Sequence, residues 1–188
     1  MTATGRPGSA FSAPTQLAAS GGDPQATVLP DGTVVAAWTT DTGVDAAARP
    51  AGGAFAAPMT VVVGAVTTTR VIGSSAGEVM VAFVDGSRQL RLQRLTPALA
   101  RLGGVFDLGA GTQTLGVALA RDGSAVFAAW TVRSTGAVRV RRIAPGGIVG
   151  PARTIAPRSL LRGHPPATAA GAVAWVNGGG RLLLSRYR

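Results

Sequence analysis

The sequence predicts an all-β protein made of four similar units of about 46 residues, each with four short antiparallel strands. Four strand-like segments end in an aromatic residue, and these aromatics are 45, 47 and 45 residues apart. Gly and Pro supply 27 and 12 of the 188 residues, which fits a chain with many turns. No segment keeps a helical period. The aromatic segments are Val34–Trp38, Val79–Phe83, Val126–Trp130 and Ala172–Trp175.

A strand and a glycine turn precede each aromatic segment. The turns are Asp31-Gly32, Ala76-Gly77, Asp122-Gly123 and Ala170-Gly171. Asp-Gly suits the backbone of a tight turn, so we interpret both aspartates as turn residues rather than as an acid–base pair. The expected first strands are Pro24–Val28, Arg70–Gly73, Gly116–Ala120 and Pro165–Ala169.

A third strand follows each aromatic segment and carries an arginine near its end. These strands are Val44–Arg49, Leu90–Arg94, Val138–Arg142 and Leu182–Arg186, and their last arginines are 45, 48 and 44 residues apart. A glycine-containing loop then leads to a fourth strand in the first three units. The fourth strands are Phe55–Val61, Val105–Leu108 and Ile148–Ile155.

The N-terminal segment Phe11–Leu17 has nearly the same residue pattern as the fourth strand Phe55–Val61. We therefore expect it to supply a fourth strand to the last unit. Units of this kind resemble the blades of β-propellers, as in sialidase-like and WD-repeat-like proteins, without a close match to either subfamily. The resemblance covers roughly Ala10 to Arg188. It implies one domain of four blades, at approximately 24–61, 67–108, 113–155 and 163–188 plus 11–17.

The resemblance implies that Phe11–Leu17 pairs with Arg181–Arg188 and closes the ring. In many propellers the N-terminal segment supplies the outer strand of the last blade in this way. The alternative is that the chain forms half of an eight-bladed ring. In either ring the repeated aromatics are interpreted as packing between neighbouring blades, because large side chains fill the wedge between two sheets.

Composition excludes several kinds of chemistry. The chain has no Cys, no Lys, one His (His164) and one Glu (Glu78), so disulfides, thiolate nucleophiles and Schiff-base lysines are absent. We predict no catalytic residue, no metal site and no cofactor. No signal peptide is recognisable at the N-terminus and no apolar run approaches the roughly 18 residues of a membrane span. Two compartments are compatible with the sequence: the cytoplasm, or the cell exterior if the chain is the mature part of a secreted protein.

The formal net charge is +10, and the charged residues are unevenly distributed along the chain. Residues 1–85 hold three Arg and six acidic groups, whereas residues 86–188 hold fifteen Arg and two Asp. A positive half attracts anionic partners. The candidate binding residues are Arg91, Arg94, Arg139, Arg141, Arg142 and Arg186. The competing interpretation of this half is a non-specific electrostatic surface.

The repeated arginines Arg49, Arg94, Arg142 and Arg186 could form a cationic ring for a carboxylate, sulfate or phosphate group. Their structural alternative is that each stem packs on a neighbour while the guanidinium binds loop carbonyls.

The sequence therefore predicts a non-catalytic binding or scaffold module for an anionic macromolecule or an acidic partner protein. One alternative is a sialidase-like carbohydrate-active enzyme or a lectin. Such an enzyme would need a nucleophile, and Tyr187 is the only tyrosine. Another alternative is a structural fragment of a larger propeller, and a homodimer is a further option.

Overall fold

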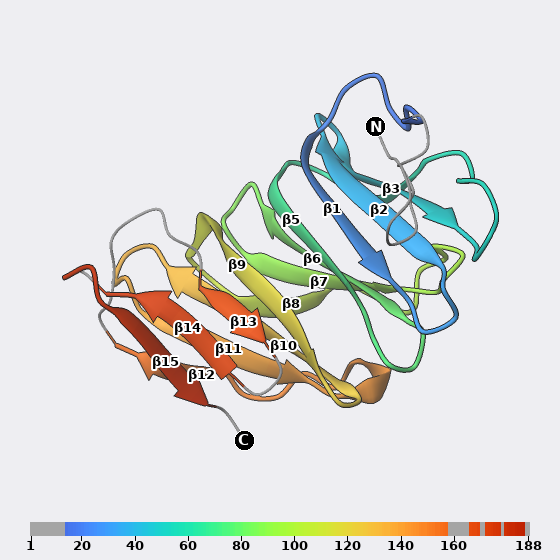
Figure 1. The fold of residues 1–188 in the computed structure, drawn as a ribbon. Helices are drawn as coiled ribbons and strands as arrows, with labels where there is room; N and C mark the ends of the chain where they lie inside the picture. The colour runs from blue at the N-terminus through green and yellow to red at the C-terminus, as the bar shows by residue number, and fades with distance from the viewer. Residues whose placement is uncertain (1–13, 158–165, 170–171, 178, 187–188) are drawn as a thin grey trace.

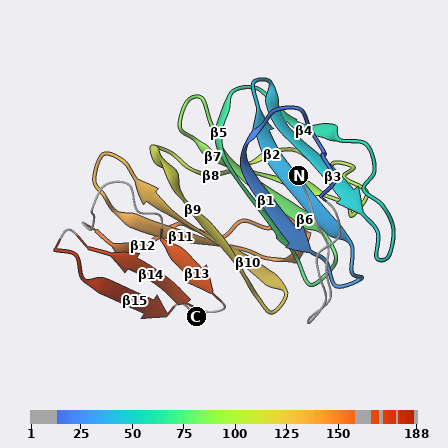
Figure 2. The same ribbon diagram turned by 45° about the horizontal axis from the view of Figure 1, so that its top comes forward.

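Four antiparallel sheets follow one another along the chain and lie side by side like the leaves of a fan (Figure 1). The computed structural model describes residues 14–157, 166–169, 172–177 and 179–186. The same order of sheets is visible after rotation (Figure 2). Within these residues, no helix has the length and hydropathy that crossing a membrane would need.

Each sheet is a simple meander of neighbouring strands. The first sheet contains β1 (Gly22–Val28), β2 (Val34–Thr40), β3 (Gly43–Arg49) and β4 (Met59–Val63). The second contains β5 (Val66–Gly73), β6 (Val79–Asp85), β7 (Leu90–Leu95) and β8 (Phe106–Gly109). The third contains β9 (Thr112–Asp122), β10 (Ala125–Val132), β11 (Val138–Ile143) and β12 (Arg153–Ala156). The fourth contains β13 (Ala167–Ala169), β14 (Ala172–Val176) and β15 (Leu182–Arg186), and a short 3-10 turn, η1 (Pro145–Gly147), precedes β12.

Two of the expected fourth strands begin later than the sequence predicts. β4 starts at Met59 instead of Phe55, and β12 starts at Arg153 instead of Ile148. A proline lies shortly before each observed start, at Pro58 and Pro151. Because proline has no N–H to donate, it cannot contribute a donor to the ladder there, and the strands begin after it.

The first Asp-Gly turn has the predicted geometry. The Thr33 N–H donates to the Asp31 carboxylate at 2.9 Å. Gly32 has a φ of +83°, in the left-handed region that glycine adopts without strain. The side chain of Asp31 is therefore used by the turn, as expected.

Neighbouring sheets pack face to face through the aromatic residues. Phe83 lies in the apolar cluster between the first and second sheets, Trp130 in the cluster between the second and third, and Trp175 in that between the third and fourth. In each case the aromatic residue belongs to the later sheet and faces the earlier one. The first strands of the four sheets, β1, β5, β9 and β13, are neighbours in that order. The interpretation of these three aromatics as packing between sheets is confirmed.

The expected four-blade closed ring is not confirmed. In the described part of the chain the fourth sheet has three strands, and the first and fourth sheets lie at opposite ends of the fan (Figure 1). Leu17 packs with Phe55 against Trp38 and Ala36 of the first sheet. Within the described residues, the N-terminal segment thus covers the aromatic face of the first sheet instead of extending the last one. The first part of the expected closing strand, residues 11–13, lies outside the described residues.

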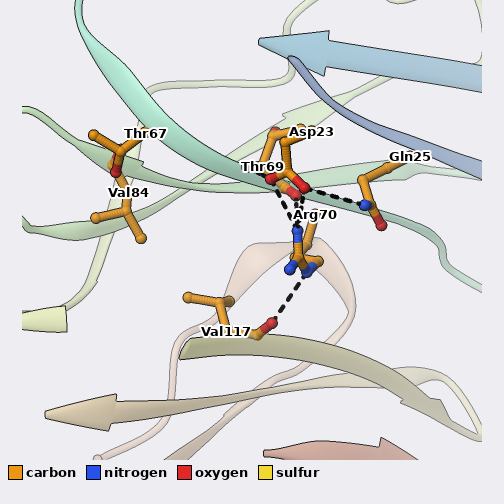
Figure 3. Close-up of polar contacts among 7 residues, drawn as sticks. All are labelled: Asp23, Gln25, Thr67, Thr69, Arg70, Val84 and Val117. Atoms are coloured by element: carbon orange, nitrogen blue, oxygen red, sulfur yellow. Dashed lines mark hydrogen bonds and ion pairs between the residues drawn. The ribbon is translucent and has the colours of Figure 1, made fainter. Parts of the chain in front are cut away.

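An ion pair on the first strands links three sheets (Figure 3). The Arg70 Nη1 atom is 2.9 Å from the Asp23 carboxylate, which also accepts the Thr69 N–H at 2.7 Å. The Arg70 Nε–H donates to the Val117 carbonyl at 3.1 Å. Asp23 belongs to β1, Arg70 to β5 and Val117 to β9. Both side chains of the pair are less than one-fifth exposed, and their contacts join the first strands of three sheets.

We expect Arg70→Ala to lower the free energy of unfolding by about 1–3 kcal/mol, because it leaves the Asp23 carboxylate without its charged partner. Arg121→Ala, at an exposed position on β9, is the matched control and should change stability by less than about 0.5 kcal/mol. Urea unfolding of both variants measures the difference. Equal stability of the two variants would show that the ion pair does not hold the sheets together.

We expect Trp130→Ala to lower the free energy of unfolding by about 3–5 kcal/mol, as truncation of a large buried side chain leaves a cavity. Trp130 is fully buried, and Gly109 on β8 approaches it so closely that an added Cβ would lie 2.6 Å from the Trp130 ring. Val63→Ala is the control, since Val63 is 75% exposed. A loss below about 1 kcal/mol in chemical denaturation would contradict the packing described above.

Candidate functional site

The six arginines predicted as binding residues come from the third strands of three sheets. Arg91 and Arg94 lie on β7, Arg186 lies on β15, and the other three lie on β11. The structure does not gather them into one surface. Each side chain has a different environment, and the environment decides whether its charge is free for a ligand.

Arg91 is neutralised by two carboxylates. Its Nε atom is 2.9 Å from Asp85 and its Nη1 atom is 3.1 Å from Asp107. Burial of the Asp85 carboxylate raises its pKa, but hydrogen bonds from Arg91 and two backbone amides outweigh burial and hold that pKa below its usual range. Asp85 therefore stays ionised at neutral pH and is unsuited to donate a proton as a general acid.

Arg94 holds two sheets together. Its guanidinium binds both oxygens of Glu78 and donates to the Gly146 carbonyl in the loop of the third sheet, at 2.5 Å. Gly147 follows with a φ of +84°, and a Cβ at that position would lie 2.6 Å from the Arg94 guanidinium. This arrangement is the structural alternative that the sequence left open, with the guanidinium bound to a loop carbonyl.

Arg139 and Arg141 lie on the face of β11 opposite the buried Val138 and Val140. The Arg141 Nη1–H donates to the Asp107 carbonyl of β8, at 2.9 Å. The Nε atoms of both arginines are buried and have no hydrogen-bond partner among the described residues. These two side chains therefore face the second sheet, and their stems are partly withdrawn from solvent.

The four arginines at the ends of the third strands do not form an equivalent ring. Arg94 and Arg142 pair with Met80 and Phe127, each three residues before the aromatic of its sheet, whereas Arg49 pairs with Val34, four residues before Trp38. A shift of one residue moves a side chain to the other face of a sheet. Arg49 accordingly lies over the Phe55 ring, 5.7 Å from its centre, on the face that Leu17 also covers.

Arg142 is exposed and lies at a pocket of the third sheet, which we call the Arg142 pocket. The pocket has a volume of about 260 Å³. Arg142 pairs with Phe127 across β10 and β11, and the Gly150 N–H donates to the Arg142 carbonyl at 2.9 Å. The pocket is lined by Phe127, Val140, Arg142, Ala144, Ile148, Gly150, Pro151 and Arg153.

A second arginine of this pocket was not singled out by the sequence analysis. Arg153 pairs with Val140 on β11, and Arg142 is two residues further along the same face. Diagonal neighbours of this kind have Cα atoms about 7–8 Å apart, so both guanidinium groups can reach one ligand. Arg153 and Arg142 are exposed, and neither has an ion pair within the described residues. The strand pairing that brings them together could not be read from spacing, because β12 starts only after Pro151.

The Arg142 pocket offers two cationic groups beside an apolar surface. Ile148 at its rim is 72% exposed, whereas Phe127 beneath is buried. Among the described residues, no acidic side chain lines the pocket. The same part of the chain contains no cluster of three His, Cys, Asp or Glu side chains that could hold a metal ion, and His164 and Tyr187 lie outside it. The described lining of the pocket can bind an anion and contains no pair of acid–base side chains.

Comparison with known proteins gives matches in structure alone. No family model and no curated protein matches the chain. The BP39L lectin from Burkholderia pseudomallei aligns with 94% of this chain at a TM-score of 0.74 and 16% identity. An α-L-arabinofuranosidase from Clostridium thermocellum aligns with 84% of it at a TM-score of 0.54 and 11% identity. The chain spans 56% of the lectin and 61% of the arabinofuranosidase. With four antiparallel sheets and these structural neighbours, the chain has an all-β, propeller-like fold.

Proposed function

We propose that this chain is a non-catalytic binding module that takes an anionic saccharide in the Arg142 pocket. The observation that carries the proposal is the pair of exposed arginines, Arg142 and Arg153, beside an apolar surface. Three of the other candidate arginines are engaged: Arg91 and Arg94 by carboxylates, and Arg141 by a backbone carbonyl. Of the remaining two, Arg139 faces the second sheet and Arg186 lies on β15, away from this pocket.

The chemistry of the pocket fits a charged sugar better than a simple ion. A guanidinium presents a planar fork of donors that matches a carboxylate or sulfate group. The apolar surface of Val140 and Ile148 suits the carbon face of a pyranose ring. The likeness to a lectin supports a saccharide as the ligand class, and the surplus of arginine in residues 86–188 supports its negative charge.

We also propose that the module lacks enzymatic activity of its own. Glycoside hydrolysis needs one carboxyl group that can protonate the leaving group. Asp85 is held ionised by its hydrogen bonds, and both oxygens of Glu78 are bound by Arg94. Neither residue lines the Arg142 pocket.

The four sheets are proposed to act as one domain that forms an open part of a propeller ring rather than a closed ring of four blades. Continuous apolar clusters join each sheet to the next, which supports a single domain. The chain spans little more than half of the propeller-like lectin that it matches, which supports an incomplete ring.

We expect the wild-type chain to bind a heparin-derived oligosaccharide and the double variant Arg142→Ala/Arg153→Ala to bind it about 100-fold more weakly. Each lost charge-assisted hydrogen bond is worth about 1.5–3 kcal/mol, and about 1.4 kcal/mol is a factor of ten. Isothermal titration calorimetry at two salt concentrations measures the loss, and the variant should also show a weaker dependence on salt.

The matched control is Arg121→Ala/Arg133→Ala, which removes the same charge at two exposed positions outside the pocket. An equal loss of affinity in the control would mean a diffuse electrostatic surface in place of a defined site. Turnover of chromogenic glycosides above the buffer rate would contradict the non-catalytic assignment.

A further inference from the structure

The last sheet exposes an apolar face that nothing in the described structure covers. Leu182 and Leu184 on β15 are 74% and 66% exposed. They alternate with Leu183 and share a strand face with Arg186. We call the surface formed by Leu182, Leu184 and Arg186 the end face. The opposite face of this sheet is packed, since Trp175 and Val173 lie in the cluster between the third and fourth sheets. Two exposed leucines on the other face of the same sheet are unusual.

Equivalent positions in the preceding sheets are buried. Leu183 pairs with Trp175, as Arg139 pairs with Trp130 and Arg91 with Phe83. This register makes Leu184 the counterpart of Val140 and of Leu92, which are 3% and 0% exposed. Both are buried because the following sheet places its aromatic face against them. The end face is thus one half of an interface that the chain itself makes at each earlier sheet.

The other half of such an interface lies at the opposite end of the fan. Trp38 belongs to the first sheet and occupies the position of the inter-sheet aromatics, but no earlier sheet packs on it within the described residues. Leu17 packs against the Trp38 ring, and a hollow of about 280 Å³ remains beside the two side chains. We call the surface formed by Leu17, Gln25, Ala36 and Trp38 the start face. Its hollow lies where an earlier sheet would place its apolar side chains.

We propose that the end face of one copy docks on the start face of a second copy. The end face corresponds to one half of the contact that recurs three times inside the chain. The start face holds the aromatic residue of the other half, Trp38, which is 6% exposed beneath Leu17 and Phe55, so the second copy docks over Leu17 and the hollow beside it.

The charges around the two faces are complementary: Arg181 and Arg186 lie just before and at the end of β15, and the first sheet with its turns carries Asp31, Asp41 and Asp45 against Arg49. The remaining aspartate of the first sheet, Asp23, is paired with Arg70 of the second sheet and adds no free charge.

The contact joins different surfaces, so it is heterologous, and two such contacts related by a two-fold axis close a ring of two copies. The fraction of the lectin that this chain spans, 56%, fits a ring in which each copy supplies about half. The ring closes without the four-blade arrangement expected from the sequence. This inference is independent of the Arg142 pocket, and its experiments do not involve the pocket residues.

The first test is the solution mass of the purified 188-residue chain, by light scattering after size exclusion, across a dilution series from micromolar concentrations. We expect twice the chain mass of 18.7 kDa. Leu182→Asp/Leu184→Asp should raise the dissociation constant by about 100-fold or more, since it places charges in an apolar interface. Val63→Asp/Val105→Asp is the matched control, because both valines are exposed in the groove between the first and second sheets.

A mixing experiment tests the head-to-tail arrangement. Leu17→Asp blocks the start face, and Leu182→Asp/Leu184→Asp blocks the end face, so each variant alone should be monomeric. An equimolar mixture retains one intact pair of faces and should recover a dimer. Near-ultraviolet circular dichroism of each variant checks that the sheets remain packed, so that loss of fold is not mistaken for loss of contact.

Three results would overturn the proposal. One is a folded wild-type monomer at all concentrations, which would leave the end face to a different occupant such as further chain. Another is a dimer that persists in the end-face variant or in Leu17→Asp. A contact between two end faces, for example, would persist in Leu17→Asp. The third is a series of larger species, because an open filament means that the rotation does not close.

Discussion

Every sheet in this fold has two faces to bury, and that constraint determines the rest of the structure. A strand such as β2 is buried along much of its length on both sides, so its sheet needs cover on both faces, from a neighbouring sheet on one and from Leu17 and Phe55 on the other. In each of the three later sheets, an aromatic residue near the end of the second strand packs on the sheet before it. Phe83, Trp130 and Trp175 do so within the chain. Trp38, in the first sheet, packs instead against Leu17 of the N-terminal segment.

Several of the abundant arginines serve the same packing. Arg70 joins the inner strands of three sheets, and Arg94 joins the second sheet to the loop of the third. Arg141 reaches a carbonyl on β8. A high positive charge in the sequence therefore does not translate directly into an anion-binding surface. At Arg142 and Arg153, where a pocket of the third sheet is left unfilled, two arginines face solvent together.

Much of the fold was predictable because the signals are local. Glycine turns, alternating small and apolar residues and a recurring aromatic residue identified the strands, and Pro58 and Pro151 explain why two of them start late. The roles of the arginines were not predictable in the same way. Arg94 binds a carbonyl 52 residues away, and a shift of one residue in register separates Arg49 from its supposed equivalents. The Asp23–Arg70 pair does have a trace in the sequence, because the two residues are 47 positions apart, close to the length of one repeat.

The central functional claim is that an anionic ligand contacts the Arg142 pocket, and amide hydrogen exchange tests it most directly. Exchange of the wild-type chain would be compared with and without a heparin-derived oligosaccharide. Binding in the pocket predicts slower exchange confined to residues 142–153, which include the loop with Ile148 and Gly150. Unchanged exchange in that segment, with protection on the second sheet or spread evenly over the exposed arginines, would contradict the claim.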